Sequence, residues 1–486
     1  MLRSLLLIPL IGAMLVAVLP LRSGGAVRRL ALAVSLLAFG WSCALLWHFD
    51  ASSAGMQLVE SHPWHERLGS TFALGVDGFS LPLILLASLL MPVSILASAA
   101  IRDGARFYYC LLLLLETAML GVFMARDWSL FYVFWELTLI PLFFLIDRFG
   151  GRQLQRAALN FVLYTMGGSV FMLIALLLLY DAVPQHSFGM AEIADAARAL
   201  PVATQTWIFL GLAIGFGVKM PVFPLHGWLP IAHVEAPSPV SILLSGILLK
   251  MGSYGLIRAV ETLPGAAWSL HETFAVLAFV SMLYGGVLAW RSRDLKEMVA
   301  YSSISHMGVV LLGIAACNVA GLAGATLQML AHGLVAASLF LLVGLLYERT
   351  HTRDVGDYAS LVQAMPRFAC FMVLAFTAAI GLPGTAGFVA ELHALVGGFA
   401  RWGCWVALLS LSVLVTAAYA LRTIGRLFTG TVSARMQHVA DLSSAELLAA
   451  AVLSFGILAL GLQPAPALRL IGASVARLAA LFGGGA

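Results

Sequence analysis

Lysine is rare in this sequence and stands where a charge is hardest to accommodate. Only three of the 27 basic residues are lysines, Lys219, Lys250 and Lys296, and the first two lie near the middle of long apolar stretches. A charge at the centre of a membrane-spanning helix costs about 2.5–3.5 kcal/mol on insertion scales. Buried lysine gives up its proton readily, whereas arginine stays charged. Lys219 and Lys250 are therefore predicted to exchange protons inside an apolar environment.

Acids and histidines stand at similar depths in other apolar stretches. Each could by itself be a hydrogen-bonded packing residue. Several at one depth favour a polar axis through the protein, because every buried charge needs a partner or water. The expected members of this axis are Glu136, Lys219, Lys250, His306, His332 and Glu391. Glu116 fits equally an axis member or the partner of one, and His226 and His233 are further candidates.

Two of these side chains stand beside helix breakers. Lys219 is followed by Pro221 and Pro224 in GFGVKMPVFPLHGWLP, and Glu391 follows Pro383 in GLPGTAGFVAELHALVGG. A break inside a span is tolerated where the helix lines a polar cavity. Five spans separate the two breaks, and a repeat of five spans must be inverted in the membrane. Paired broken helices in inverted repeats are typical of transporters, with the site at the midplane.

The same repeat predicts which ionisable groups correspond to each other. It places Glu136 opposite His306, and Lys219 opposite Glu391. Lysine, glutamate and histidine all exchange protons, so protons are the leading cargo, and Na⁺ stays an alternative.

The composition requires that these side chains be carried by membrane-spanning helices. The chain is 61% hydrophobic and 10% charged, whereas about 25% of a soluble domain is charged. A span needs roughly 20 apolar residues, and the lengths favour helices over barrel strands. We expect an all-α polytopic protein whose fourteen spans are approximately 2–21, 30–49, 79–100, 107–125, 128–146, 157–180, 206–229, 239–257, 272–290, 298–316, 319–347, 368–400 (broken), 404–428 and 447–463.

The expected spans divide the chain into four parts and leave no room for a folded extramembrane domain. These parts are 1–106 with three spans, the repeats 107–260 and 261–430, and 431–486 with the last span and a tail expected on the membrane surface. Five scattered cysteines form no C-x-x-C pair, and no P-loop or G-x-G-x-x-G is present. We therefore expect neither a metal nor a bound cofactor in this chain.

The distribution of basic residues predicts the orientation. The odd-numbered connections carry 17 of them, which places these connections in the cytoplasm and both termini outside. The longest loops, at about 50–78 and 181–205, fall outside. The eight basic residues of the outer side are Arg3, Arg67, Arg126, Arg198, Arg258, Arg401, Arg469 and Arg477.

Five stretches resemble a known family. They are VKMPVFPLHGWLPIAHVEAPSPVSILLSGILLKMGSYG (218–255), FYVFWELTLIPLFFLI (131–146), LGVDGFSLPL (74–83), LYERTHTRDVGDYASL (346–361) and GLPGTAGFVAELHALVGGF (381–399). Together they are similar to the antiporter-like subunits of bacterial NADH:quinone oxidoreductase, and among these to the subunit M type. The resemblance covers almost the whole chain.

The resemblance implies fourteen helices in two inverted five-helix repeats, acting as a proton-translocating module in the cytoplasmic membrane of a bacterium. Glu136 resembles the acid of the first half-channel, Lys219 the central lysine and Lys250 the bridging lysine. His306 and His332 resemble the connecting histidines, and Glu391 the terminal acid. FMN, iron–sulfur clusters and quinone are then expected in other subunits, and the sister antiporter-like subunits are the expected partners.

These roles predict a mechanism in which Glu136 is the charge partner of Lys219. When Glu136 is drawn away, Lys219 passes its proton along water to Lys250 and on to Glu391. A subunit of a Na⁺/H⁺ antiporter and a subunit of a membrane-bound hydrogenase are the alternatives from related families. A scaffold that does not pump is a third, and it leaves the charges in the spans unexplained.

Overall fold

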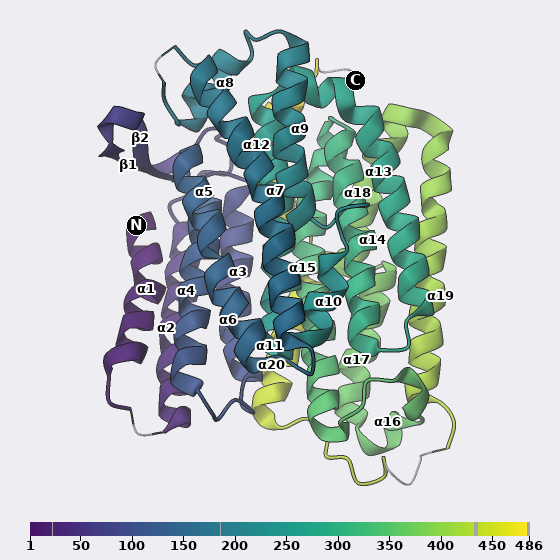
Figure 1. Cartoon of the computed structure of the whole chain (residues 1–486). Helices are drawn as coiled ribbons and strands as arrows, with labels where there is room; N and C mark the ends of the chain where they lie inside the picture. The colour runs from purple at the N-terminus through teal and green to yellow at the C-terminus, as the bar shows by residue number, and fades with distance from the viewer. Residues whose placement is uncertain (22, 185, 432–435, 484–486) are drawn as a thin grey trace.

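The computed structural model describes residues 1–21, 23–184, 186–431 and 436–483. Long helices run side by side in one bundle, with a two-stranded hairpin and α8 at one end and α16 at the other (Figure 1). Arg22 and Arg435, which belong to the cytoplasmic count of basic residues, lie outside the described residues.

Three helices and a hairpin form the N-terminal part, and five spans follow. The first elements are α1 (Leu2–Val18), α2 (Gly24–Leu45), β1 (Gln57–His65), η1 (Glu66–Leu68), β2 (Ser70–Val76) and α3 (Ser80–Ala97). The next are α4 (Ala105–Met124), α5 (Trp128–Leu137), α6 (Leu139–Phe149), α7 (Leu154–Ala182), α8 (Met190–Ala197), α9 (Val202–Lys219), α10 (Trp228–Glu235), α11 (Ser238–Leu243), the π-helical turn η2 (Leu244–Leu248) and α12 (Leu249–Thr262).

The second set of five spans and the C-terminal part complete the bundle. Their elements are α13 (Pro264–Arg291), α14 (Leu295–Ala315), α15 (Val319–Thr350), η3 (Val355–Asp357), α16 (Leu361–Ala364), α17 (Pro366–Ile380), α18 (Ala386–Trp402), η4 (Gly403–Leu409), α19 (Ser410–Phe428), α20 (Ser444–Leu462) and α21 (Ala465–Ala480). Twelve stretches of the described residues are long and apolar enough to cross a membrane, and α1 and α17 are shorter apolar helices.

Every one of the fourteen expected ranges contains a helix or a pair of helices, and both expected breaks are present. Helix α9 ends at Lys219, and α10 begins only at Trp228. Helix α17 ends at Ile380, where Gly381 adopts φ +81°, and α18 begins at Ala386. The prolines therefore end these helices, as the sequence predicts.

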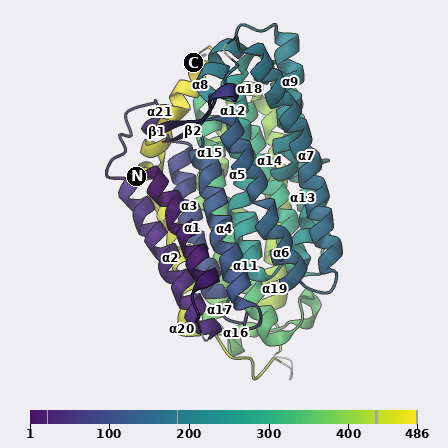
Figure 2. The same ribbon diagram turned by 60° about the vertical axis from the view of Figure 1, so that its left-hand side comes forward.

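The chain is nearly all helical, as the sequence predicts, and the loop after the second span adds one β-hairpin. Strands β1 and β2 pair antiparallel from Gln57 opposite Val76 to His65 opposite Ser70. The first strand contains Pro63 and is largely exposed, so it has no apolar alternation for a sequence pattern to detect. The C-terminal tail forms α21 (Figure 2), and the hydroxyl of Ser474 on this helix accepts a hydrogen bond from the backbone N–H of Gly78, just after β2.

Three of the expected axis residues, Lys250, His306 and His332, lie on the most deeply buried spans of the bundle. In the most apolar 18 residues of each span, the buried share is 100% for Ser238–Thr262 and 94% for both α14 and α15. The same share is only 39% for α7 and for α13. A helix that is buried all round packs only against protein, so polar side chains on it can find protein partners. The interior helices are therefore suited to hold ionisable groups.

Glycines bring α18 close to α15. A Cβ on Gly324 would lie 2.2 Å from the backbone nitrogen of Ala394, and a Cβ on Gly397 would lie 2.2 Å from that of Gly321. Small residues let two membrane helices approach through their backbones. This contact sets the position of α18, and hence of Glu391.

We expect Gly324→Ala to destabilise the protein by about 1–3 kcal/mol, because the added methyl group must separate two backbones that cannot yield locally. Thermal denaturation of the purified protein in detergent measures the effect. Gly425→Ala is the matched control: nothing lies within 4 Å of a Cβ there, and alanine is the better helix former. Equal thermal stability of the two variants would contradict this packing argument.

Candidate functional site

Four of the expected residues form a row across α12, α15, α14 and α18. Lys250 Nζ on α12 lies 2.7 Å from Nδ1 of His332 on α15. The ring of His332 lies 5.4 Å from that of His306 on α14, centroid to centroid. His306 Nδ1 in turn lies 3.1 Å from Glu391 Oε1 on α18. All four residues are buried, and Glu391 is the most exposed of them at 9%. The row crosses from helix to helix instead of following any one helix.

The lysine end of the row is set by the irregular turn in span eight. Lys250 Nζ donates to the carbonyl of Ser245 at 2.6 Å, inside the π-helical turn. The hydroxyl of Ser245 also lies 3.0 Å from that of Ser303 on α14. A π-helical turn leaves its carbonyls less well paired, and such turns are frequent at functional sites. The Lys250 amine thus has two neighbouring acceptors, and no carboxylate among the described residues is in contact with it.

At the acid end, Nδ1 of His306 has two neighbours that require opposite roles of it. An ionised Glu391 carboxylate is an acceptor only, so its Oε1 requires a proton on Nδ1. The amide Nε2 of Gln328, 3.4 Å away, is a donor only, so it requires an Nδ1 without a proton. The protonation state of the imidazole therefore decides which bond forms. Gln328 lies one helical turn before His332, and this spacing is the sequence signal that could have revealed it.

Two small cavities flank His306 and Glu391. One is bordered by Gln328 and His332, and the other by Ser305 and Thr416. Each has room for about one water molecule. The Glu391 side chain reaches back toward the break, since a Cβ on Gly381 would lie 3.0 Å from its Oε2. The acid therefore lies beside both space for water and the interrupted helix.

Lys219 belongs to a second, separate group. Its Nζ donates to Thr138 Oγ1 at 2.8 Å and to the Trp135 carbonyl at 3.4 Å, and it lies 4.1 Å from the centroid of the Trp135 ring. Thr138 separates α5 from α6, so this lysine is held at a second irregular point. Sequence reasoning missed Thr138, because nothing in FYVFWELTLIPLFF breaks a helix before the proline.

Glu136, the expected charge partner of Lys219, interacts with it without direct contact. No carboxylate lies in ion-pair contact with Lys219 among the residues that the structure describes. Glu136 Oε1 is buried without a hydrogen-bond partner and acts on the lysine only at longer range. Glu136 stands two positions before Thr138, so its side chain points to a different side of the helix. The hydroxyl and the carbonyl hold the ammonium instead.

The two broken helices place their charges differently. Lys219 is the last residue of α9, whereas Glu391 is the sixth residue of α18, after the second break. Lys219 and Glu391 therefore do not occupy equivalent positions in the two broken helices. The expected correspondence between them does hold at the level of helices: Lys219 contacts the second span of its repeat, and Glu391 contacts His306 in the second span of the other.

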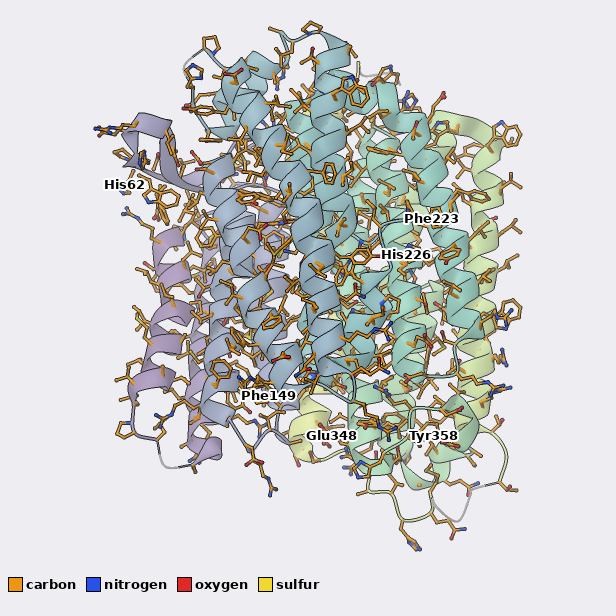
Figure 3. The ribbon with its side chains drawn as sticks, viewed as in Figure 1. His62, Phe149, Phe223, His226, Glu348 and Tyr358 are labelled. Atoms are coloured by element: carbon orange, nitrogen blue, oxygen red, sulfur yellow. The ribbon has the colours of Figure 1, made fainter. Side chains whose placement is uncertain are left out.

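The remaining candidates lie outside the row. His233 stacks on Phe340 at 4.4 Å, and both of its ring nitrogens are buried without a partner. His226 stacks on Phe223 within the first break, where Figure 3 shows the two rings together at mid-height. Glu116 is fully buried in α4, and neither of its carboxylate oxygens has a partner. Within the described chain, no contact joins Lys219 to Lys250.

A cavity of about 730 Å³ opens at the end of the bundle that carries α16. Phe149 and Glu348, which Figure 3 shows at this end, belong to its wall. Lys296 also lines it and donates to the carbonyl of Ala236, at the end of α10. The sequence placed Lys296 in a loop, whereas it is 4% exposed in the first turn of α14.

These features define an antiporter-like membrane protein, a bundle with two broken spans that each carry an ionisable side chain inside the protein. Residues 125–416 match the family described as NADH:quinone oxidoreductase/Mrp antiporter, transmembrane, and the chain belongs to this family. It is 42% identical over 475 residues to NAD(P)H-quinone oxidoreductase chain 4 2 of Thermosynechococcus vestitus, with 95% of this chain and 89% of the relative covered.

Two solved structures share the fold. A chain of respiratory complex I from Thermus thermophilus has a TM-score of 0.91 and 32% identity, and the match covers 100% of both chains. A chain of the Mrp complex from Dietzia sp. has a TM-score of 0.87 and 23% identity, with 98% of this chain and 97% of that chain covered. The second likeness concerns the fold alone.

Proposed function

We propose that this chain is the chain 4, or subunit M, component of an NADH:quinone oxidoreductase and that it moves protons across the membrane. The observation that carries the proposal is the row from Lys250 through His332 and His306 to Glu391, in which neighbouring groups lie within reach of a proton or of a single water. A row of groups that can each bind and release a proton is what proton relays in membranes require.

The chemistry of the row favours protons over a metal cation. Hard cations bind oxygen ligands, whereas three of the four members are a lysine and two histidines. Glu391 contributes the only carboxylate among them. A Na⁺/H⁺ antiporter is therefore less well supported than proton transfer, although the fold is shared with an Mrp complex.

The two groups of the site suggest a division of labour. Lys219 on the first broken helix holds a proton between Thr138 and Trp135. Its release toward Lys250 requires water or movement in the break from Pro221 to Pro224, because no side chain bridges the gap in the described structure. Glu136 acts from a distance, so movement of this acid changes the charge balance at Lys219 without breaking a contact.

The basic residues orient this path. The end of the bundle with the hairpin and α8 faces outside, and the large cavity beside Lys296 opens to the cytoplasm. Both termini lie toward the hairpin end (Figures 1 and 2), which agrees with an even number of crossings. The cytoplasmic membrane of a bacterium is the proposed location. Sister antiporter-like subunits are the proposed neighbours, and FMN, iron–sulfur clusters and quinone are assigned to other subunits.

Glu391→Gln in the assembled complex tests the proposal. The amide keeps the shape and a hydrogen bond to His306 but cannot take up a proton, so we expect transport through this chain to fall roughly 10-fold or more. Proton uptake into vesicles is measured against quinone reduction in the same sample. Unchanged proton movement per quinone reduced would contradict the row as the path.

A further inference from the structure

A second polar cavity lies at the opposite end of the bundle from the large one. It measures about 300 Å³ and lies between the start of α5, helix α8, the end of α12 and helix α21. Four arginines from distant parts of the sequence line it, together with two acids. They are Arg126, Arg198, Arg258 and Arg477, with Asp195 and Glu261.

This gathering of arginines runs against the charge distribution of the chain. Only eight basic residues fall on the outer side by the sequence count, and four of those eight meet at this one cavity. Arginines at cytoplasmic helix ends follow from the general positive-inside bias, but that bias depletes the outer side. The positive-inside bias therefore does not explain why four arginines gather at this cavity.

The acids present do not neutralise the cluster. Arg258 pairs with Asp77 at 2.7 Å and with Glu261 at 2.8 Å, Glu261 also pairs with Arg477 at 2.5 Å, and Arg198 contacts Asp195 at 3.5 Å. Three carboxylates thus face four guanidinium groups.

Arg126 is the guanidinium left over. None of the described acidic side chains is in ion-pair contact with it, and its Nη1 is buried without a hydrogen-bond partner. Burial, together with the positive charge of Arg258, lowers its pKa. Arg126 is partly buried, and a cation that is withdrawn from water without an ion partner is costly, so one negative charge placed in the cavity would lower that cost.

We propose that this cavity binds a phosphate-type oxyanion, either the phosphate of an anionic phospholipid or inorganic phosphate. Guanidinium groups present paired N–H donors that match two oxygens of a phosphate, whereas chloride offers a single acceptor atom. Trp128 adds a further donor at the wall, because it is 1% exposed and its Nε1 has no partner.

The depth of the cavity fits a lipid phosphate as well as a free one. Trp47 and Trp207 are 84% and 75% exposed near this end of the bundle, and tryptophan gathers at the level of the lipid headgroups. Arg198 lies directly before α9, which carries Trp207. A headgroup at this level could therefore reach the arginines without leaving the bilayer.

The test uses the intact purified complex, stripped of lipid in a neutral detergent. One series adds inorganic phosphate against chloride at equal ionic strength, and a second adds phosphatidylglycerol against phosphatidylcholine in mixed micelles. Thermal unfolding reports stabilisation, and native mass spectrometry reports bound phosphate or lipid. We expect saturable binding of phosphate or of phosphatidylglycerol, at least 10-fold weaker in Arg126→Met.

Two further variants distinguish a loss of binding from a failure to fold. Arg198 is partly exposed and makes only a 3.5 Å contact, so Arg198→Met should fold normally and still weaken binding. Arg469→Met is the matched control, since Arg469 lies on the same helix as Arg477 but does not line the cavity. It should leave binding unchanged.

The outcomes distinguish a lipid phosphate from free phosphate, and the anion site from the proposed proton transport. Binding of phosphatidylglycerol without binding of phosphate identifies a lipid site, and equal response to free phosphate identifies a soluble anion. Absence of both, or equal binding by Arg126→Met and Arg469→Met, overturns the site. Proton movement that persists in Arg126→Met shows that the proposed transport does not depend on it.

Discussion

Replacing Lys219 by alanine in the assembled complex is expected to abolish the contribution of this chain to proton movement while quinone reduction continues. Its amine donates to the Trp135 carbonyl in α5 and to the hydroxyl of Thr138, which stands between α5 and α6. Without it, the Thr138 hydroxyl and the Trp135 carbonyl remain, and neither exchanges protons near neutral pH. A positioned proton donor typically contributes about 100-fold or more, so transport through this chain should fall by that factor.

Lys219→Arg distinguishes proton exchange from a structural role of the charge. Arginine keeps the positive charge and can still donate to Thr138, but it does not release its proton. If the lysine only holds α9 against α5 and α6, this variant should restore function. If it carries a proton, Lys219→Arg should be nearly as inactive as Lys219→Ala. The measurement is the number of protons moved per quinone reduced in proteoliposomes. A wild-type ratio in either variant would contradict the mechanism.

The second large effect concerns stability. Asp77 is fully buried before α3, where its Oδ1 accepts from the backbone N–H groups of Phe79 and Ser80 and its Oδ2 pairs with Arg258. Burial opposes the charge of Asp77, but Arg258 and Arg126 outweigh it and lower the pKa. Asp77→Asn keeps the shape and leaves Arg258 without this carboxylate. We expect a loss of about 3–5 kcal/mol, as for other broken buried pairs.

Asp195→Asn is the control for this prediction, because Asp195 also pairs with an arginine of the cavity but its pair with Arg198 is exposed and 3.5 Å long. Exposed pairs contribute about 0–1 kcal/mol. The free energy of unfolding in detergent should therefore change little for Asp195→Asn and strongly for Asp77→Asn. A similar small change in both would mean that Glu261 alone compensates Arg258. Added phosphate should recover part of the Asp77→Asn loss if the cavity binds anions.

The sequence predicted most of the helices, because hydropathy over about 20 residues is a strong signal and the prolines mark both breaks. It also identified the members of the row, since an ionisable side chain within an apolar run is conspicuous. It could not predict that Thr138 and not Glu136 contacts Lys219. That choice depends on a kink between α5 and α6 that tertiary packing imposes, with no helix breaker at the junction itself.

Other features were beyond the sequence for related reasons. The π-helical turn at Leu244–Leu248 arises within a run of good helix formers, so only the packing of span eight reveals it. The hairpin depends on backbone pairing between two largely exposed strands. The meeting of Arg126, Arg198, Arg258 and Arg477 joins residues up to 351 positions apart, a distance over which local patterns carry no information.

The row from Lys250 to Glu391 has an electrical consequence. Lys250, His332 and His306 each stand near the middle of their spans, and the row passes between helices, so it runs parallel to the membrane plane. A charge that moves across the whole membrane does work of about 2.3 kcal/mol per 100 mV. Movement along the row changes its depth little and does almost none of that work. The membrane voltage should therefore act on the steps by which a proton reaches Lys250 and leaves Glu391, and the transfers between them should proceed at nearly the same rate whatever the voltage.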